Sequence, residues 1–335
     1  MSVGTVERYY VGLDVGGTTM KAAVVGDDGR PLTSPVVLPT RPERGQEAGL
    51  ETMCETIRRA IAAAGLSLDR ITAIGVATPG LMDIRAGVIL DPPNLKPWKN
   101  VPVREHIRKV FDKPTAYQND ANAAAYGEFW VGAARGCHSM VLFTLGTGIG
   151  GGIIINNQII EGEHSHGGEL GHLRIALPDE GRLCGCGARG CLEAYASATA
   201  VVRRTREALA VWRGSTRLRD YYTATDAELT TRVIFELAED GDELARQIVE
   251  ETAFYLALGA TAVIAVVDPE IIVFGGGMAE AGAGFCARID TYIRRFGLPH
   301  PSRQVRVALA ELGADAGVIG AAGCARQLVL GGHHP

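Results

Sequence analysis

Short apolar runs alternate with polar segments along the chain, and their lengths and spacing predict a mixture of strands and helices. Residues 9–14 and 20–26 are apolar runs on either side of a glycine turn, which is typical of two strands joined as a hairpin. Over 47–64 the apolar side chains recur at the spacing of one helix face, at Leu50, Met53, Ile57 and Ile61. The N-terminal part of the chain therefore predicts a hairpin followed by a helix.

The middle of the chain contains buried strands that end in polar turns. Residues 71–77 predict a buried strand, and residues 115–118 predict another that leads into an alanine-rich helix. Asn119 or Asp120 would cap this helix, because either side chain can accept hydrogen bonds from the first backbone amides. Both polar turns are places where ligands commonly bind in α/β proteins.

The C-terminal half is largely helical. We expect helices over 193–211, 228–267 and 316–328, strands over 270–274 and 305–310, and a surface connection over 212–224. Asp240-Gly241-Asp242 would interrupt the long helix. Its apolar part, 254–267, is shorter than the roughly 20 residues that span a bilayer and ends at Asp268-Pro269, so it predicts a core helix.

Composition narrows the class of protein. The chain has 335 residues, of which 47% are hydrophobic, so it can bury a large core and form about two domains. Its net charge of -5 comes from mixed acids and bases, which argues against a nucleic-acid-binding patch. Residues 1–8 are polar and lack the apolar core of a signal peptide. We therefore expect a cytoplasmic protein without a membrane anchor.

Three of the seven cysteines are clustered in a glycine-rich loop. Cys184, Cys186 and Cys191 follow His172, and three sulfurs with one imidazole are a ligand set for tetrahedral zinc. The alternative is three buried or paired cysteines, but clustered thiols in a cytosolic chain more often bind a metal. The carboxylates of Glu169 and Glu193 flank this loop. The pattern predicts a structural zinc site that shapes a polar pocket.

Two glycine turns each lie between apolar segments. The first is Asp14-Val15-Gly16-Gly17-Thr18-Thr19, and the second, after a strand over 139–145, is Gly146-Thr147-Gly148 followed by the apolar residues 153–160. Backbone amides in such turns can hold the phosphates of a nucleotide. Gly146, Gly148 and Gly151 also fit a dinucleotide fingerprint, but a strand follows them where that motif requires a helix. Two similar hairpins indicate an internal duplication.

These motifs resemble those of a known family. Glu169-Leu170-Gly171-His172, the cysteine loop ending in Glu193, and Asn119-Asp120-Ala121-Asn122 are similar to the signature of the ROK family, which comprises sugar kinases and sugar-responsive repressors. Within that family the sequence is most similar to the bacterial glucokinases. The resemblance implies an α/β, actin-like ATPase fold (a duplicated ribonuclease-H-like fold) with a zinc loop and two domains around a cleft. The domains would be residues 1–118 with about 312–335, and residues 119–311.

The resemblance also implies roles for individual residues. Asp120 would be the general base, although alone it could be only a helix cap. Asp14, otherwise an ordinary acid at a strand end, would hold magnesium through water. The sugar would contact Pro79, Gly80, Asn94, Asn119, Asp120, Glu169, His172 and Glu193, although composition alone assigns most of 91–98 to a surface turn. The nucleotide would contact Asp14, Gly16, Gly17, Thr18, Thr19, Lys21, Gly146, Thr147, Gly148, Gly275, Gly276 and Gly277.

The implied activity is an ATP-dependent hexokinase that phosphorylates the 6-hydroxyl of glucose, acts in glycolysis and forms a homodimer. A kinase for fructose, mannose or N-acetylmannosamine is the main alternative, because the hydroxyl-binding residues are largely shared. A sugar-sensing repressor would need a DNA-binding domain, for which the sequence leaves no room before residue 9. A zinc-ribbon interaction module would leave both glycine hairpins unexplained. ATP, a hexose, Mg2+ and Zn2+ are therefore the expected ligands, and polyphosphate is the alternative donor.

Overall fold

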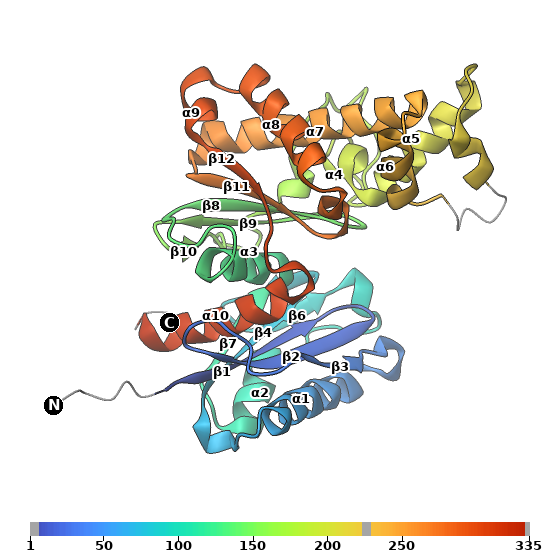
Figure 1. Ribbon diagram of the computed structural model, residues 1–335. Helices are drawn as coiled ribbons and strands as arrows, with labels where there is room; N and C mark the ends of the chain where they lie inside the picture. The colour runs from blue at the N-terminus through green and yellow to red at the C-terminus, as the bar shows by residue number, and fades with distance from the viewer. Residues whose placement is uncertain (1–6, 223–228, 332–335) are drawn as a thin grey trace. The chain divides into compact units, whose positions relative to one another are not determined.

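The computed structural model describes residues 7–222 and 229–331, and within them the chain forms two compact units (Figure 1). The first unit contains the residues up to Gly136, Gly152–Gly168 and the residues from Glu311 onward, and the second contains Cys137–Gly151 and Glu169–Ala310. Residues 1–6, 223–228 and 332–335, which belong to segments or domains assigned above, lie outside the described residues. The domain boundaries expected from the family stay a prediction.

The first unit is built on a five-stranded sheet in the order β3-β2-β1-β4-β7. Strands β1, β4 and β7 are parallel, whereas β2 is antiparallel to both β1 and β3. The hairpin predicted at the N-terminus is therefore confirmed. The strands are β1 (Tyr9–Val15), β2 (Thr19–Gly26), β3 (Val36–Pro39), β4 (Ile71–Thr78) and β7 (Thr115–Asn119), with a separate hairpin of β5 (Leu81–Asp83) and β6 (Val88–Asp91).

Helices cover both faces of this sheet (Figure 1). On one face lie α1 (Gln46–Ala63) and α2 (Val103–Phe111), and on the other lie α3 (Asp120–Trp130) and α10 (Ala316–Leu330). Helix α10 approaches the strands so closely that a methyl group at Gly75 would lie 1.8 Å from the carbonyl oxygen of Ala321. Small residues on both sides are therefore required for this packing.

The second sheet has the order β10-β9-β8-β11-β12, which is the order of the first sheet with each strand replaced by its counterpart. Its β8, β11 and β12 are parallel and β9 is antiparallel to β10, again as in the first sheet. The predicted internal duplication is confirmed by this match of order and direction. The strands are β8 (Met140–Leu145), β9 (Ile149–Ile155), β10 (Gln158–Ile159), β11 (Ile271–Gly275) and β12 (Arg306–Leu309).

The helices of the second unit pack around α7 (Glu243–Val267). Among the residues that the structure describes, α7 is the one helix long and apolar enough to cross a membrane, but about half of its apolar window, 56%, is buried inside the protein. It is a core helix, as predicted. The other helices are α4 (Glu193–Ala196), α5 (Ala198–Val211), α6 (Thr231–Glu239), α8 (Ala283–Phe296) and α9 (Pro299–Gln304).

Short 3-10 helices complete the described secondary structure. They are η1 (Pro42–Arg44), η2 (Leu68–Arg70), η3 (Pro93–Leu95), η4 (Leu170–His172), η5 (Arg217–Tyr221), η6 (Gly277–Ala281) and η7 (Gly313–Asp315).

Three predicted elements differ from the structure for local reasons. The helix expected over 193–211 is interrupted at Ser197, whose extended backbone and side-chain hydroxyl cap α5 through the amide of Ala200. The strand expected over 153–160 turns back at Asn156 and Asn157, which both adopt positive φ. In the turn expected over 91–98, Leu95 and Trp98 are buried in the core beneath α1.

A buried carboxylate joins two separate parts of the first unit. Glu128 on α3 is 0% exposed, and its oxygens accept hydrogen bonds from the amides of Ala133, Glu311 and Leu312 at 2.8–3.1 Å. Glu311 and Leu312 lie between β12 and α10. The loop after α3 and the segment that leads into α10 are therefore fixed by one side chain.

Candidate functional site

The carboxyl ends of three parallel strands bring candidate residues of the first unit together. In the strand register Asp14 of β1 pairs with Ala77 of β4, and Thr78 of β4 pairs with Asn119 of β7. The first glycine turn, the Pro79-Gly80 loop and the start of α3 follow these strands directly. They therefore share one edge of the sheet, where α/β proteins place their ligands.

The first glycine turn lies against the predicted sugar-binding segments. The amide of Gly16 donates to the carbonyl oxygen of Thr19 at 2.8 Å, which closes the turn. A methyl group at Gly17 would lie 3.1 Å from the carbonyl oxygen of Asn94. At Gly80 φ is +89°, and a methyl group there would lie 2.7 Å from Cα of Pro92. The segment of Pro92 and Asn94 therefore contacts both the glycine turn and the proline loop.

The start of α10 packs against Asp14 and largely shields its side chain from solvent. A methyl group at Gly317 would lie 2.5 Å from its carboxylate oxygen. Burial raises the pKa of Asp14 to about 6, and the opposing charge of Lys21, its cross-strand partner, lowers it by less. The Nζ atom of Lys21 donates to the carbonyl oxygen of Ala314 at 3.4 Å. A divalent cation near Asp14 would favour the ionised carboxylate that burial disfavours, so the site fits the predicted magnesium.

Asn119, and not Asp120, caps helix α3. Its Oδ1 accepts hydrogen bonds from the amides of Ala121 at 2.9 Å and Asn122 at 3.2 Å. Asp120 is the first helical residue, and its Oδ1 accepts from the amide of Ala121 at 2.8 Å. The cap role that competed with a catalytic role for Asp120 therefore belongs to its neighbour.

Gln118 supports this helix start and was not among the residues predicted from the sequence. It is 4% exposed, and its Oε1 accepts from the amide of Asn119 at 2.9 Å and from Nδ2 of Asn122 at 3.1 Å. Its Nε2 donates to the carboxylate of Glu161 at 2.7 Å. A glutamine directly before the predicted Asn119-Asp120 helix start was the signal that could have identified it.

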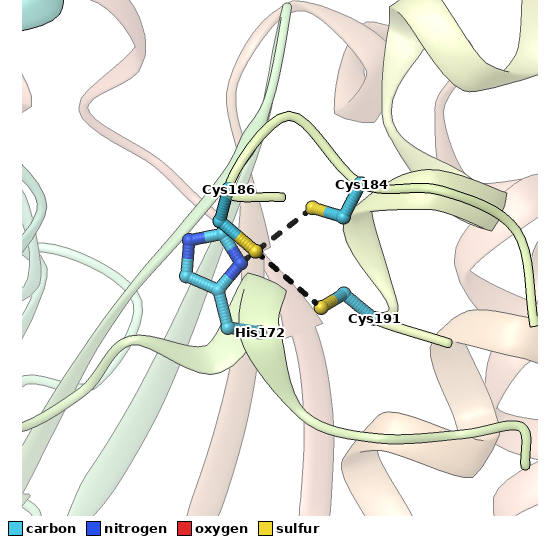
Figure 2. Close-up of side chains that lie close together, drawn as sticks. All are labelled: His172, Cys184, Cys186 and Cys191. Carbon is cyan, nitrogen blue, oxygen red and sulfur yellow. Dashed lines mark hydrogen bonds between the residues drawn. The ribbon is translucent and has the colours of Figure 1, made fainter. Parts of the chain in front are cut away.

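In the second unit the four predicted metal ligands converge on one point (Figure 2). The Sγ atom of Cys184 lies 3.8 Å from Nδ1 of His172, and the Sγ atoms of Cys186 and Cys191 are 3.8 Å apart. Ligands about 2.3 Å from a tetrahedral ion stand about 3.8 Å from one another. The seven cysteines form no disulfide, so the paired form of the alternative is wrong, whereas Cys184 and Cys191 are buried, as its other form expects.

Two of the three thiols in this candidate metal site need a nearby cation to ionise at neutral pH. Burial raises the pKa of Cys184 to about 12 and also raises that of Cys191, whereas the amide of Ala188 lowers the pKa of the exposed Cys186. Two of three thiols would therefore stay protonated at neutral pH without a positive charge. A bound divalent ion supplies that charge, and the donor set fits one.

Glu193 connects the metal cluster to the second glycine turn. Its Oε2 accepts from the amide of Ile149 at 3.0 Å, and the thiol of Cys184 donates to its Oε1 at 3.5 Å. A methyl group at Gly148 would lie 2.4 Å from Oε2 of Glu193. Glu169 is exposed, and its carbonyl oxygen accepts from the amide of His172 at 3.0 Å.

The predicted nucleotide-binding glycines of the second unit lie together. Gly275 of β11 pairs with Thr144 of β8, and Gly276, with φ of +85°, approaches the carbonyl oxygen of Leu145 so closely that a methyl group would be 2.6 Å away. The Gly275–Gly277 and Gly146–Gly148 segments therefore meet at the carboxyl ends of β8 and β11. How the candidate residues of the two units combine stays a prediction.

Several characterised proteins are similar to the chain over nearly its whole length. A glucokinase from Halalkalibacterium halodurans is 33% identical, with 96% of each chain covered. The crystal structure of a ROK hexokinase from Thermus thermophilus has a TM-score of 0.81 and 37% identity, covering 96% of this chain and 99% of that one. A ROK glucokinase from Streptomyces griseus, solved in complex with glucose and AMPPNP, has a TM-score of 0.77 and 33% identity, covering 95% and 99%.

Regulators also occur among the similar proteins. A xylose repressor from Caldicellulosiruptor bescii is 28% identical over 82% of this chain and 67% of its own length. The sequence model of the ROK family itself matches residues 10–328. With this match, the duplicated sheets and two solved ROK enzymes of the same fold, the chain belongs to the ROK family.

Proposed function

We propose that the chain is an ATP-dependent glucokinase that transfers the terminal phosphoryl group of ATP to the 6-hydroxyl of glucose. The relatives named glucokinase and hexokinase support the activity. The observation that carries the proposal is the gathering of Asp14, the first glycine turn, the Pro79-Gly80 loop and Asp120 at one edge of the first sheet. This edge contains both a turn that would bind phosphates and a candidate base.

Asp120 would accept the proton of the sugar hydroxyl as its oxygen attacks the terminal phosphorus in line with the leaving oxygen. Such transfers need mainly positioning and neutralisation of charge. The Asn119 cap and Gln118 fix the start of α3, whose first residue is Asp120. Asp120 would thus be held in place by neighbours that take no part in the proton transfer.

Directional hydrogen bonds would hold the sugar. Asn119 uses Oδ1 for its cap, so it would offer its amide nitrogen to a hydroxyl. His172 directs Nδ1 to the metal cluster, so it would offer Nε2. Glu193 uses Oε2 for Ile149, and its Oε1 accepts from the Cys184 thiol; once a metal ionises that thiol, Oε1 would be left to face the sugar. Glu169, Pro79, Gly80 and Asn94 would complete the pocket.

Two metal ions belong to the proposal. Zinc, held by His172, Cys184, Cys186 and Cys191, would be structural, since four protein ligands leave no open position. Magnesium, held near Asp14 through water, would neutralise charge on the phosphates of ATP when bound. The amides of both glycine turns, with Thr18, Thr19 and Lys21, would bind those phosphates.

A coupled assay of ADP release tests the activity and the choice of sugar. Glucose, fructose, mannose and N-acetylmannosamine are offered with ATP, and polyphosphate is offered as a competing donor. We expect the highest kcat/KM with glucose and ATP. A higher value with another sugar would assign that sugar kinase instead, and absence of turnover together with a DNA shift would assign a regulator. The homodimer and the cytoplasmic location expected from the family stay predictions.

Substitution of the base tests the mechanism. Asp120→Asn keeps the shape of the side chain but cannot accept the proton, so kcat should fall by about 100- to 10,000-fold while glucose binding persists. Asp112→Asn, at an exposed position after α2, is the matched control and should retain full activity. A kcat near the wild-type value in Asp120→Asn would refute the assignment.

A further inference from the structure

The metal-binding loop contacts both the backbone amide and the backbone carbonyl of one residue, Ile149, in the second glycine hairpin. Glu193, two residues after Cys191, accepts a hydrogen bond from the amide of Ile149. Gly171, the neighbour of His172, lies against the carbonyl oxygen of the same residue, where a methyl group would be 2.1 Å away. The backbone of Ile149 is therefore held between the two ends of the segment that carries the metal ligands.

The residues after Glu193 extend this contact along the turn. The amide of Ala198 donates to the carbonyl oxygen of Gly146 at 2.9 Å, and the hydroxyl of Thr199 donates to the carbonyl oxygen of Thr147 at 2.9 Å. Within the turn itself the amide of Gly146 donates to the carbonyl oxygen of Gly148 at 3.0 Å. Residues 193–199, which follow Cys191, therefore contribute three of the hydrogen bonds that hold this turn.

We propose that the metal cluster positions the Gly146–Gly148 turn for the nucleotide, so that metal binding and nucleotide binding strengthen each other. Gly171 and Glu193 are the positioning residues that carry this coupling, through the Ile149 backbone. The inference rests on the proposed function, since it takes the turn to bind phosphates. Under this proposal the bound metal affects the binding of the nucleotide as well as the residues that would bind the sugar.

The contacts of the metal-binding loop indicate that loss of the metal lowers nucleotide affinity. A loop without its metal loses the cross-link among His172, Cys184, Cys186 and Cys191, and the positions of Gly171 and Glu193 become less restricted. The turn would then have to be ordered by the nucleotide itself, which lowers nucleotide affinity. Thermodynamic linkage requires the converse: bound nucleotide must retain the metal more tightly by the same factor.

Two glycines of the loop provide a matched pair of variants. Gly171→Ala places a methyl group against the Ile149 carbonyl oxygen and should separate the loop from the turn while leaving all four metal ligands in the chain. Gly185→Ala, between Cys184 and Cys186, places its methyl group in open space, with no atom within 4 Å. It is the control for adding a methyl group to the same loop.

The experiment measures binding, with no turnover required. AMPPNP with Mg2+ is titrated calorimetrically into the zinc-loaded protein, and zinc transfer to a chromogenic chelator is followed with and without AMPPNP. In the parent and in Gly185→Ala we expect AMPPNP to slow zinc transfer about tenfold. In Gly171→Ala we expect one zinc per chain, about tenfold weaker AMPPNP binding and no slowing of transfer.

The outcomes separate this inference from the proposed function. Equal zinc-transfer rates with and without bound AMPPNP in the parent would overturn the coupling and leave the kinase activity untouched. Gly171→Ala behaving like Gly185→Ala would overturn the assigned route through Ile149. Failure of the parent to bind AMPPNP would overturn both the coupling and the proposed kinase.

Discussion

The turn between β1 and β2 and the turn between β8 and β9 occupy equivalent places in two sheets of the same strand order, yet they are held in different ways. The first is closed by Gly16 and Thr19, and the hydroxyl of Thr40, just after β3, donates to the carbonyl oxygen of Gly16 at 2.7 Å. The second is held by Gly171, Glu193, Ala198 and Thr199, all from outside its sheet.

The two turns also differ in charge. Asp14 precedes the first turn and has a raised pKa because it is buried, whereas the equivalent part of the second hairpin has no acid and receives the Glu193 carboxylate from the metal-binding loop. Each hairpin therefore has a carboxylate beside its turn, but the first comes from its own strand and the second comes from a separate segment. The first turn is bonded to residues of its own hairpin and to Thr40, whereas the second is bonded to Glu193, Ala198 and Thr199, which follow the candidate metal ligand Cys191.

Removal of one metal ligand should give the largest effect, and it should change the second turn while leaving the first unchanged. Cys186→Ala should lose the metal and about 4 kcal/mol or more of unfolding free energy, a fraction of the roughly 10–16 kcal/mol that zinc supplies to zinc-finger peptides. Hydrogen exchange should accelerate at Gly146–Ile149 and stay unchanged at Asp14–Lys21. The control is Cys286→Ala on α8, which should keep its zinc. Equal acceleration in both hairpins would contradict the comparison.

Neutralisation of Asp14, the acid beside the first turn, should give the second-largest effect, which is on turnover. Asp14→Asn should lower kcat by about 100- to 1000-fold, the usual cost of removing one group that stabilises charge in the transition state. Asp28→Asn, at an exposed position after β2, should change kcat by less than about twofold. Steady-state kinetics at saturating Mg2+ measures both. A normal kcat in Asp14→Asn would show that the first turn needs no acid.

The pH dependence of stability gives the smallest expected effect. The carboxyl of Asp14 has a pKa of about 6 in the folded protein, above its ordinary value of 3.8, so the folded state binds the proton more tightly. Its contribution to stability is present below pH 4 and is lost as the pH rises through 6, for a total of about 2–3 kcal/mol.

Urea unfolding without Mg2+ measures this contribution. Asp14→Asn should equal the wild type near pH 4 and exceed its stability at pH 8, because the variant buries no charge. Wild-type and variant curves that stay parallel from pH 4 to pH 8 would exclude burial of Asp14 as the cause. The second turn has no corresponding acid of its own. Variants of that turn should therefore differ from the wild type in stability by the same amount at pH 4 and at pH 8.

The sequence predicted the parts of the molecule that local pattern determines. Both hairpins, the core helix α7 and the convergence of His172 with three cysteines followed from spacing and residue type. The choice of Asn119 over Asp120 as the cap could not be predicted, since both side chains suit that position. The partners of Gln118 and Glu193, at Glu161 and Ile149, are distant in sequence and depend on tertiary packing.

The hydrogen bonds of Glu128 determine which segments an isolated fragment of the first unit must contain. A fragment that ended soon after α3 would keep this carboxylate but remove the amides of Glu311 and Leu312, and it would also uncover the sheet face that α10 shields. A workable fragment must therefore rejoin α10 to the N-terminal sequence and also keep residues 152–168, which belong to the first unit and include Glu161, the partner of Gln118.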